Sequence, residues 1–447
     1  MAERAPRSGS RKLLIIAYHF PPDAAVGGTR PAKFAKYLAR DGWQPYILTV
    51  RERYFAETDW SRLDEVRDLP TIRTRCWPTL LQMAVISKRW LGVRSSGASR
   101  GLTFRLTRYA NSLFELPDQQ IGWLIPAVWT AYRLIRTNAI RTVLVSSPPR
   151  TTALIGVLLS YLVPIRLITD LRDPWLTPYL QPGGTFRSVG DIAARRSALG
   201  DVIERWLEKK IMERSSKVIV TTDRLADVLR RAYPAAAAGI AVITNGYDAE
   251  DMPVVDPPEP GRRFTLSYLG SLLLDRAPEP FFDAVAQLLR ERRLSPSEIR
   301  INVIGHIGST LNGRINGLIA GNGLKDCVHV ADAVTYADSL REMLRSDALL
   351  LITPKQTCSV PAKAFEYLAA RKAILCLAPE SASADLIATT RAGLVAPPDD
   401  VEAIKTAVMT LVDAFRRGYP LSGCADASAY ERKALSQQLA DQLAQLG

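Results

Sequence analysis

A lysine and a glutamate, one helical turn apart, follow an apolar strand and could together bind a nucleotide. The run Ala348 to Thr353 predicts a buried parallel strand, and residues 359–361 predict the capped start of a helix from Ala362 to Arg371. A helix that begins at the carboxyl end of a strand favours an anion, because its first N–H groups carry partial positive charge. A nucleoside diphosphate would place its phosphates beside Lys363 and its ribose hydroxyls on Glu366.

A simpler interpretation of this pair stays open. Lys363 and Glu366 could form only a solvated ion pair on the helix surface, worth a few tenths of a kcal/mol. Anion sites after a strand also occur in many folds, so the position alone does not identify the ligand.

A glycine-containing loop near the start of the chain is a second candidate site. The strand Lys12 to Ala17 leads into this loop, and a helix is predicted from Pro31 to Arg40. Gly27 and Gly28 would let the backbone approach a ligand closely. No GxGxxG pattern is present, so the loop is not a dinucleotide fingerprint. We assign His19, in the same loop, to the side of the site that binds an acceptor.

Polar residues also follow the predicted strand Arg166 to Thr169. Ligands of open α/β sheets bind at the carboxyl ends of the strands. We therefore predict Asp170 and Asp173 as acceptor-side residues, and Arg172 and Asp173 as catalytic residues. The alternative is a structural Asp–Arg pair that braces the loop. The stretch 177–197, with its proline and glycines, predicts a loop that closes over an acceptor.

The chain of 447 residues is long enough for two domains, each alternating strands and helices. Residues 1–10 form a polar tail, 11–250 the first doubly wound domain, and 251–263 a proline-rich linker. A second doubly wound domain covers 264–425, and a helix is predicted within 426–447.

Charge and cysteine content indicate the compartment of the protein and the surfaces that it contacts. The net charge is +13, and residues up to 250 hold 37 Lys+Arg against 22 Asp+Glu. Lys88 to Arg108 mixes basic and aromatic residues as a segment at an anionic membrane surface does, although an ordinary solvated basic face would have the same composition. No nucleic-acid-binding module is present. Five scattered cysteines and the polar start predict a cytoplasmic protein, with peripheral contact at the inner face of the plasma membrane.

Three stretches resemble family 4-type retaining glycosyltransferases of bacterial surface-polysaccharide assembly. They are residues 363–370 (KAFEYLAA), 245–248 (NGYD) and 170–175 (DLRDPW). The resemblance implies a GT-B fold, in which two Rossmann-like domains face each other across a cleft. The first domain would bind the acceptor and the second the nucleotide-sugar donor, while the last helix would cross back to the first domain.

The resemblance also implies roles for single residues. Glu366 matches the second of two family glutamates, and Cys358 stands at the position of the first. After Gly270 the family usually has an arginine and, five residues later, a lysine on the donor pyrophosphate. Here Ser271 and Arg276 take those positions as donor-binding residues, and Arg276 would also be catalytic. The usual catalytic histidine has no counterpart, and Asp173 stands closest to its place.

The predicted function is transfer of a sugar, with retained anomeric configuration, from a nucleotide diphosphate donor to a cell-surface glycan or lipid-linked acceptor. The leaving diphosphate would be met by the helix start at 360–363, by Arg276 and by the backbone of Gly27 and Gly28. No metal or other cofactor is expected, because the three histidines lie far apart. Two alternatives stay open: a nucleotide-sugar 2-epimerase-like enzyme, and a catalytically silent membrane-associated scaffold of the same fold.

Overall fold

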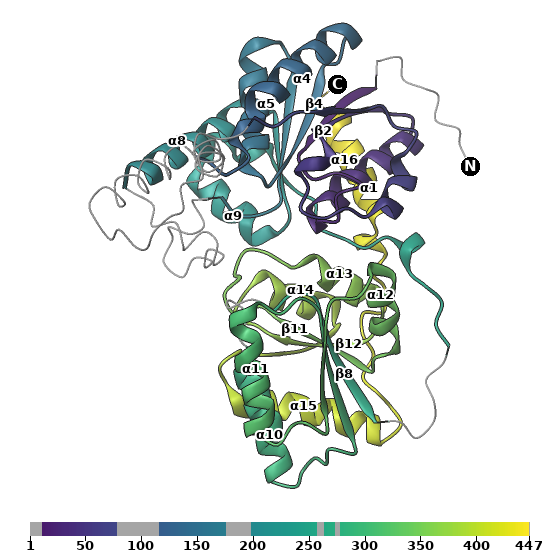
Figure 1. The fold of residues 1–447 in the computed structure, drawn as a ribbon. Helices are drawn as coiled ribbons and strands as arrows, with labels where there is room; N and C mark the ends of the chain where they lie inside the picture. The colour runs from purple at the N-terminus through teal and green to yellow at the C-terminus, as the bar shows by residue number, and fades with distance from the viewer. Residues whose placement is uncertain (1–10, 78–115, 176–197, 257–262, 273–277, 447) are drawn as a thin grey trace, which may run out of the picture.

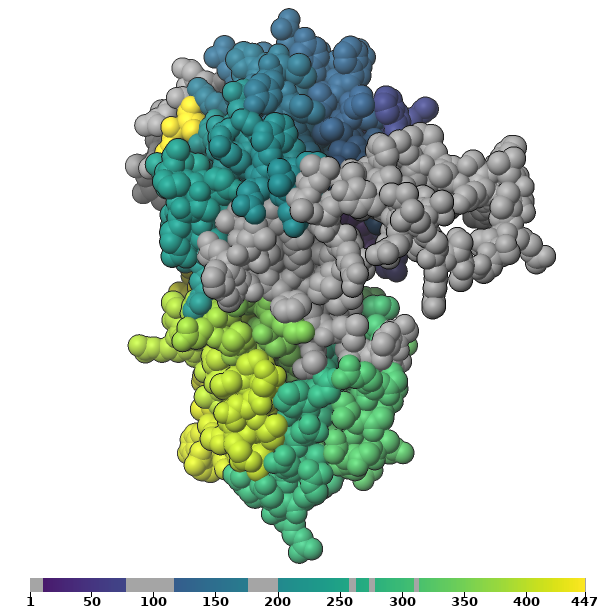
Figure 2. Space-filling model, turned by 90° about the vertical axis from the view of Figure 1, so that its left-hand side faces the viewer, coloured from purple at the N-terminus to yellow at the C-terminus, as the bar shows by residue number. Residues whose placement is uncertain are grey.

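Two parallel α/β units, one above the other in Figure 1, make up the computed structural model. The structure describes residues 11–77, 116–175, 198–256, 263–272 and 278–446. The predicted loop at 177–197 and the basic segment at 88–108 lie outside these ranges. Figure 2 shows the second unit, in green and yellow, as a separate lobe below the first. Two Rossmann-like units with helix-covered parallel sheets confirm the predicted fold class.

The sheet of the first unit is parallel throughout, with the order β3-β2-β1-β4-β5-β6-β7. Its strands are β1 (Lys12–Ala17), β2 (Gln44–Val50), β3 (Thr71–Thr74), β4 (Thr142–Ser147), β5 (Arg166–Leu171), β6 (Lys217–Val220) and β7 (Ile240–Val242). The central strands are apolar on both faces because helices cover both sides of the sheet. The strand order reverses between β1 and β4, and ligands of such sheets bind at this reversal.

Helices cover both faces of this sheet. They are α1 (Thr29–Arg40), α4 (Leu124–Asn138), α5 (Arg150–Leu162), α8 (Ala198–Arg214) and α9 (Asp223–Ala232). Apolar residues of α4, α5, α8 and α9 form one core cluster with the sheet, whereas α1 contributes to the cluster on the opposite face. The short 3-10 helix Trp60–Val66 lies against α1.

The second unit repeats this architecture with the strand order β10-β9-β8-β11-β12-β13. Its strands are β8 (Phe264–Leu269), β9 (Ile299–Ile304), β10 (Val328–Ala331), β11 (Ala348–Ile352), β12 (Ala373–Leu377) and β13 (Gly393–Ala396). Its helices are α10 (Glu279–Arg290), α11 (Ser309–Gly321), α12 (Tyr336–Arg345), α13 (Ala362–Ala369), α14 (Ala382–Thr390) and α15 (Val401–Arg416). The order reverses between β8 and β11, so the loops that follow these two strands flank the second reversal.

The last helix, α16 (Arg432–Ala444), packs on the first unit rather than on the second. Leu435, Leu439 and Leu443 are buried in the same cluster as α1, and Figure 1 shows yellow α16 beside purple α1. The helix begins at Arg432, later than the sequence predicts, because a separate 3-10 turn precedes it. Within the described ranges, no helix combines the length and apolar character needed to cross a membrane.

Candidate functional site

The loops at the carboxyl ends of the two sheets contact each other. Thr222, the N-cap of α9, donates its hydroxyl to the carbonyl of Cys358 at 2.6 Å. Arg224 on α9 forms an ion pair with Asp385 on α14, with Nη2 2.9 Å from Oδ1. Because ligands of doubly wound sheets bind at these ends, the two predicted half-sites face a common region.

Three predicted residues meet at the loop after β1. A Cβ built on Gly27 would lie 3.4 Å from both terminal guanidinium nitrogens of Arg172 and 3.4 Å from Cδ2 of His19. A Cβ on Gly28 would lie 3.3 Å from the backbone nitrogen of Phe20. The loop therefore packs against Arg172 and His19 directly before α1 begins at Thr29.

Arg172 holds this glycine loop against the end of β4. It is buried, and its guanidinium donates to the carbonyls of Gly27 and Pro148 at 2.6 Å each and to that of Ser147 at 3.3 Å. Burial lowers the pKa of Arg172, and Asp170 and Asp173 oppose that shift. The three hydrogen bonds to backbone carbonyls indicate that Arg172 positions this loop. The catalytic role predicted for Arg172 from the sequence stays a prediction.

His19 is oriented by a buried carboxylate that the sequence prediction missed. Its Nδ1 lies 2.7 Å from Oδ2 of Asp23, whose other oxygen accepts the N–H of Ala25 at 3.0 Å. When Nδ1 carries the proton, Nε2 is left as an acceptor. The spacing of four residues within one loop is the sequence signal that could have identified Asp23 as the partner.

Asp170 is fully buried, with 0% of its surface exposed. Arg30 donates to it from Nε and Nη2 at 3.0 to 3.1 Å, and Ser146 donates at 3.1 Å. Arg30 also donates to the carbonyl of Ile243 at 2.8 Å, so the pair connects α1, β5 and the end of β7. This placement favours the bracing interpretation over an acceptor contact, and the bracing partner is Arg30 rather than the neighbouring Arg172.

Two predicted catalytic residues remain, Asp173 and Arg276, and the structure describes Asp173 alone of these two. Asp173 is exposed in the loop after β5, at the carboxyl end of the sheet where acceptor contacts were predicted. Arg276 lies outside the described residues, so its predicted contact with the donor pyrophosphate stays a prediction.

On the second unit, Lys363 reaches back to the turn after β8. Its Nζ lies 3.5 Å from the centroid of the Tyr268 ring. A Cβ on Gly270, where φ is +117°, would lie 3.6 Å from Cδ and Nζ of Lys363. The positive φ explains the glycine, and Lys363 lies in van der Waals contact with this turn. Ser271 is exposed beside it, and its carbonyl accepts the hydroxyl of Tyr268 at 2.9 Å. Gly270, Ser271 and Lys363 are thus brought together as predicted partners of one ligand.

Helix α13 begins at Ala362, but its predicted cap is wrong. Pro361 is the N-cap, and it makes no side-chain capping hydrogen bond. The predicted cap, Ser359, lies two residues before it.

Glu366 lies one turn into α13 and accepts the hydroxyl of Tyr336 at 3.1 Å. Burial raises the pKa of Glu366, and the Tyr336 hydrogen bond opposes this rise. The guanidinium of Arg62, from the first unit, lies 5.9 Å from the centroid of the Tyr336 ring. The predicted ribose-binding carboxylate is thus connected through one tyrosine to the opposite unit.

Cys358, at the position of the first family glutamate, is buried in the apolar cluster of the first unit. A thiol in that position supplies packing instead of the negative charge that a glutamate would supply.

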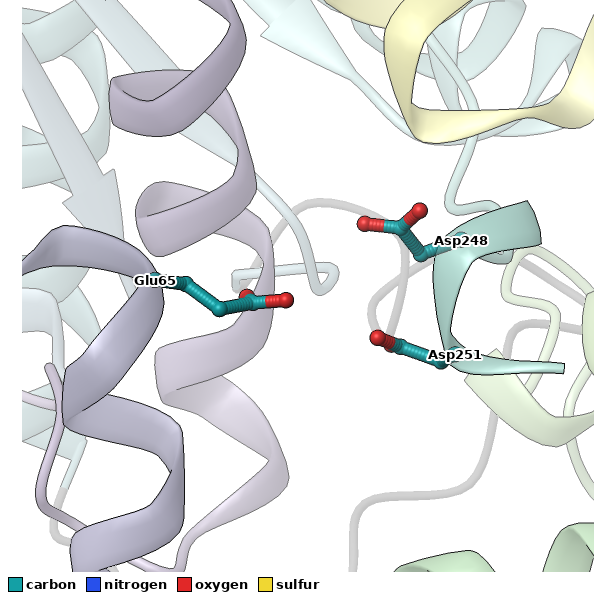
Figure 3. Close-up of side chains that lie close together, drawn as sticks. All are labelled: Glu65, Asp248 and Asp251. Carbon is teal, nitrogen blue, oxygen red and sulfur yellow. The ribbon is translucent and has the colours of Figure 1, made fainter. Parts of the chain in front are cut away.

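Three carboxylates from two distant parts of the sequence come together in space beside α1. Oxygens of Glu65, Asp248 and Asp251 lie within 4.8 Å of one another, and Figure 3 shows the three side chains converging. Nζ of Lys33 lies 2.7, 2.6 and 3.0 Å from them, respectively. The ammonium group of Lys33 therefore takes the central position of this cluster, which joins α1 to the segment that leads out of the first unit.

Two facing Rossmann-like units, each with a glycine turn and polar side chains at its strand-order reversal, define the GT-B class of fold. Residues 28–251, half of the chain, match the family described as Glycosyltransferase Family 4. Residues 263–414 match the family described as Glycosyl transferases group 1. The chain therefore belongs to glycosyltransferase family 4, which confirms the predicted family and enzyme class.

Individual relatives are more distant. D-inositol 3-phosphate glycosyltransferase of Gordonia bronchialis is 27% identical over 180 residues, which are 37% of this chain and 37% of that protein. HepE of Anabaena, solved with UDP, superposes with a TM-score of 0.62 at 13% identity, covering 97% of this chain and 100% of HepE. Sucrose-phosphate synthase of Thermosynechococcus elongatus gives a TM-score of 0.65 at 15% identity, covering 97% and 98%. At these identities the two structures establish the fold alone.

Proposed function

We propose that this protein transfers a glycosyl group, with retention of configuration, from a nucleoside diphosphate sugar to a glycan or lipid-linked acceptor. One observation carries the proposal. Lys363 packs against Gly270 at the strand-order reversal of the second unit, and Glu366 follows one turn later on the same helix. The cation and the glycine turn fit the phosphates of one ligand, and the carboxylate one helical turn away fits its ribose.

The donor diphosphate would lie at the start of α13, where Lys363 and the N–H groups of the first turn supply positive charge. Glu366 would accept hydrogen bonds from the ribose hydroxyls. HepE, which shares the fold, has been solved with UDP and with UDP-glucose, which supports a nucleotide-sugar donor for this chain.

The reaction breaks the bond between the anomeric carbon and the diphosphate oxygen and forms one to an acceptor oxygen. Negative charge grows on the departing diphosphate, and we assign its stabilisation to Lys363, Arg276 and the backbone at Gly27 and Gly28 rather than to a metal. The acceptor hydroxyl must lose a proton as the new bond forms. Asp173 and His19 are the proposed groups on that side, and Asp23 would orient His19.

The acceptor would be a cell-surface glycan or lipid-linked sugar at the inner face of the plasma membrane. The excess of basic residues in the first half of the chain supports this assignment, because anionic lipid attracts such charge.

Calorimetry with UDP-, GDP- and ADP-sugars tests the donor, and NMR of the product reports the anomeric configuration. We expect one nucleotide to bind and the product to keep the donor configuration. Absence of binding to every donor would overturn the proposal and favour the catalytically silent scaffold. Isomerisation of the sugar without an acceptor would favour the epimerase-like enzyme.

A further inference from the structure

Three neighbouring helices of the first unit expose large apolar side chains to solvent. Helix α5 lies between α4 and α8 on one face of the sheet, so the outer surfaces of the three helices point the same way. The exposed apolar side chains on this surface, called here the α4–α5–α8 face, are Ile125, Trp129, Leu158, Tyr161, Leu162, Val202 and Trp206. In Figure 2 the blue residues of α4 and α5 adjoin the teal residues of α8. Soluble proteins seldom leave so many large apolar groups on adjoining elements unless a partner covers them.

The charged groups on the same face are mostly basic. Across the described side chains of α4, α5 and α8, the exposed charged residues are Arg133, Arg136, Arg205, Lys209, Arg214 and Glu213. Glu213, the acid among them, is held 2.7 Å from Lys210 and 3.7 Å from Lys209. The face is therefore positively charged around its aromatic side chains.

Aromatic rings and arginines are paired within the face. The guanidinium of Arg214 lies 4.1 Å from the centroid of the Tyr161 ring and donates to the carbonyl of Ser160 at 2.6 Å, which joins α8 to α5. Trp129 stacks on Tyr132 with ring centroids 6.4 Å apart. Amphipathic rings beside cations are typical of protein surfaces at the boundary between lipid headgroups and acyl chains.

The direction of the helices relates the α4–α5–α8 face to the proposed catalytic cleft. Helices α4 and α8 run into β4 and β6 through short connections, so their first turns lie at the carboxyl ends of the strands. Trp129 stands in the first half of α4 and Trp206 at the middle of α8, so Trp129 is the nearer of the two to the carboxyl ends of the strands, where the glycine loop and Asp173 lie.

We propose that the α4–α5–α8 face rests on a membrane surface that contains anionic lipid. The tryptophans and aliphatic side chains would enter the headgroup region, and the exposed arginines and Lys209 would contact phosphate groups. This docking is independent of the donor chemistry proposed above, because it needs no nucleotide. It would hold the cleft beside the lipid surface, where a lipid-linked acceptor is available.

The test is co-sedimentation of the full chain with vesicles of phosphatidylcholine and phosphatidylglycerol in equal parts, against phosphatidylcholine alone. Trp129→Ala combined with Trp206→Ala should weaken binding roughly tenfold or more, because two large side chains lose their burial in lipid. The matched control is Trp60→Ala. Trp60 is 60% exposed, against 63% for Trp129 and 56% for Trp206, but it lies in the 3-10 helix beside α1.

A second pair of variants tests the charges. Arg205→Gln combined with Lys209→Gln should weaken binding about fivefold for each cation, since a basic residue near an anionic surface contributes roughly 1 kcal/mol. Arg417→Gln combined with Lys433→Gln removes the same charge from α15 and α16 and should leave binding nearly unchanged. Circular dichroism confirms that each variant folds.

Three results would overturn the proposal. Equal binding to vesicles with and without phosphatidylglycerol would remove the role of charge. Unchanged binding of both α4–α5–α8 variants would place the membrane contact elsewhere in the chain. A dimer in light scattering that Trp129→Ala combined with Trp206→Ala dissociates, with no vesicle binding by the parent, would assign the face to a second copy of this chain.

Discussion

Replacing Glu366 by glutamine is the sharpest test of the donor site. The side chain accepts the Tyr336 hydroxyl at 3.1 Å and stands one turn from Lys363, so glutamine keeps the shape and removes only the charge. A hydrogen bond to a charged group contributes about 1.5–3 kcal/mol, which converts to a loss of affinity of roughly tenfold to a hundredfold. Turnover at saturating donor should fall less, because the ribose contact is present in both the ground state and the transition state.

The pH dependence supplies an independent readout. Burial raises the pKa of Glu366, so its charge is lost at a higher pH than that of an ordinary glutamate. Donor affinity of the parent should therefore fall as the pH drops through that raised pKa, and Glu366→Gln should lack this component. Folding stability changes in the opposite direction. With its folded-state pKa above the unfolded value, the parent loses stability as the pH rises through the interval between the two, and the variant should not.

Calorimetric titration with the donor found in the panel gives the affinity, and thermal unfolding at several pH values gives the stability. Glu402→Gln is the matched control, because its carboxylate is 74% exposed on α15 and pairs with Lys405. If Glu366→Gln binds donor as tightly as the parent does and has the same pH profile, the ribose assignment is wrong and the donor site lies elsewhere in the cleft.

Four further outcomes are expected. Turnover should survive EDTA, because we assign the charge on the leaving group to protein cations; a loss that Mg²⁺ or Mn²⁺ reverses would contradict this. Arg276→Ala should lower both kcat and donor affinity, and unchanged kinetics would leave Arg276 a surface residue. Asp170→Asn should lower the free energy of unfolding in urea by about 3–5 kcal/mol, because Arg30 would stay buried without its carboxylate partner. The control Asp385→Asn, at an exposed ion pair, should change this free energy by about 1 kcal/mol or less. Lys33→Ala should destabilise the protein, because Asp251 would lose its ion pair and Lys36 alone would remain beside Glu65 and Asp248. Millimolar Mg²⁺ or Ca²⁺ should restore part of the melting temperature of this variant, and equal effects of these ions on the parent would contradict the prediction.

The strands that carry the site were predictable because burial on both faces requires continuous apolar runs. β1 matches its predicted range of Lys12 to Ala17, and β11 begins at the predicted Ala348 and ends at Ile352, one residue before the predicted end. The rule that ligands bind at carboxyl ends then brings Gly270 and Lys363 to one place, although 92 residues separate them along the chain. β3 was not predicted, since the strand is short and its sequence, TIRT, is mostly polar.

The partners of the site residues could not be predicted in the same way. Asp170 follows the predicted strand Arg166 to Thr169, as a ligand contact would, but it lies inside β5 and its carboxylate bonds to Arg30, 140 residues away in sequence. Nothing in the pattern around Asp170 distinguishes it from Asp173, which ends exposed two residues after the end of β5. The difference arises because strand side chains alternate between faces, and the face on which Asp170 lies is closed by α1.

The glycine loop shows how such buried partners serve the site. Arg172 fixes the carbonyl of Gly27, while Arg30, in the first turn of α1, anchors that helix to Asp170. Lys33, one turn further along α1, is held by the three carboxylates near the exit from the first unit. One helix therefore connects the loop proposed to face the diphosphate with the segment that joins the two units.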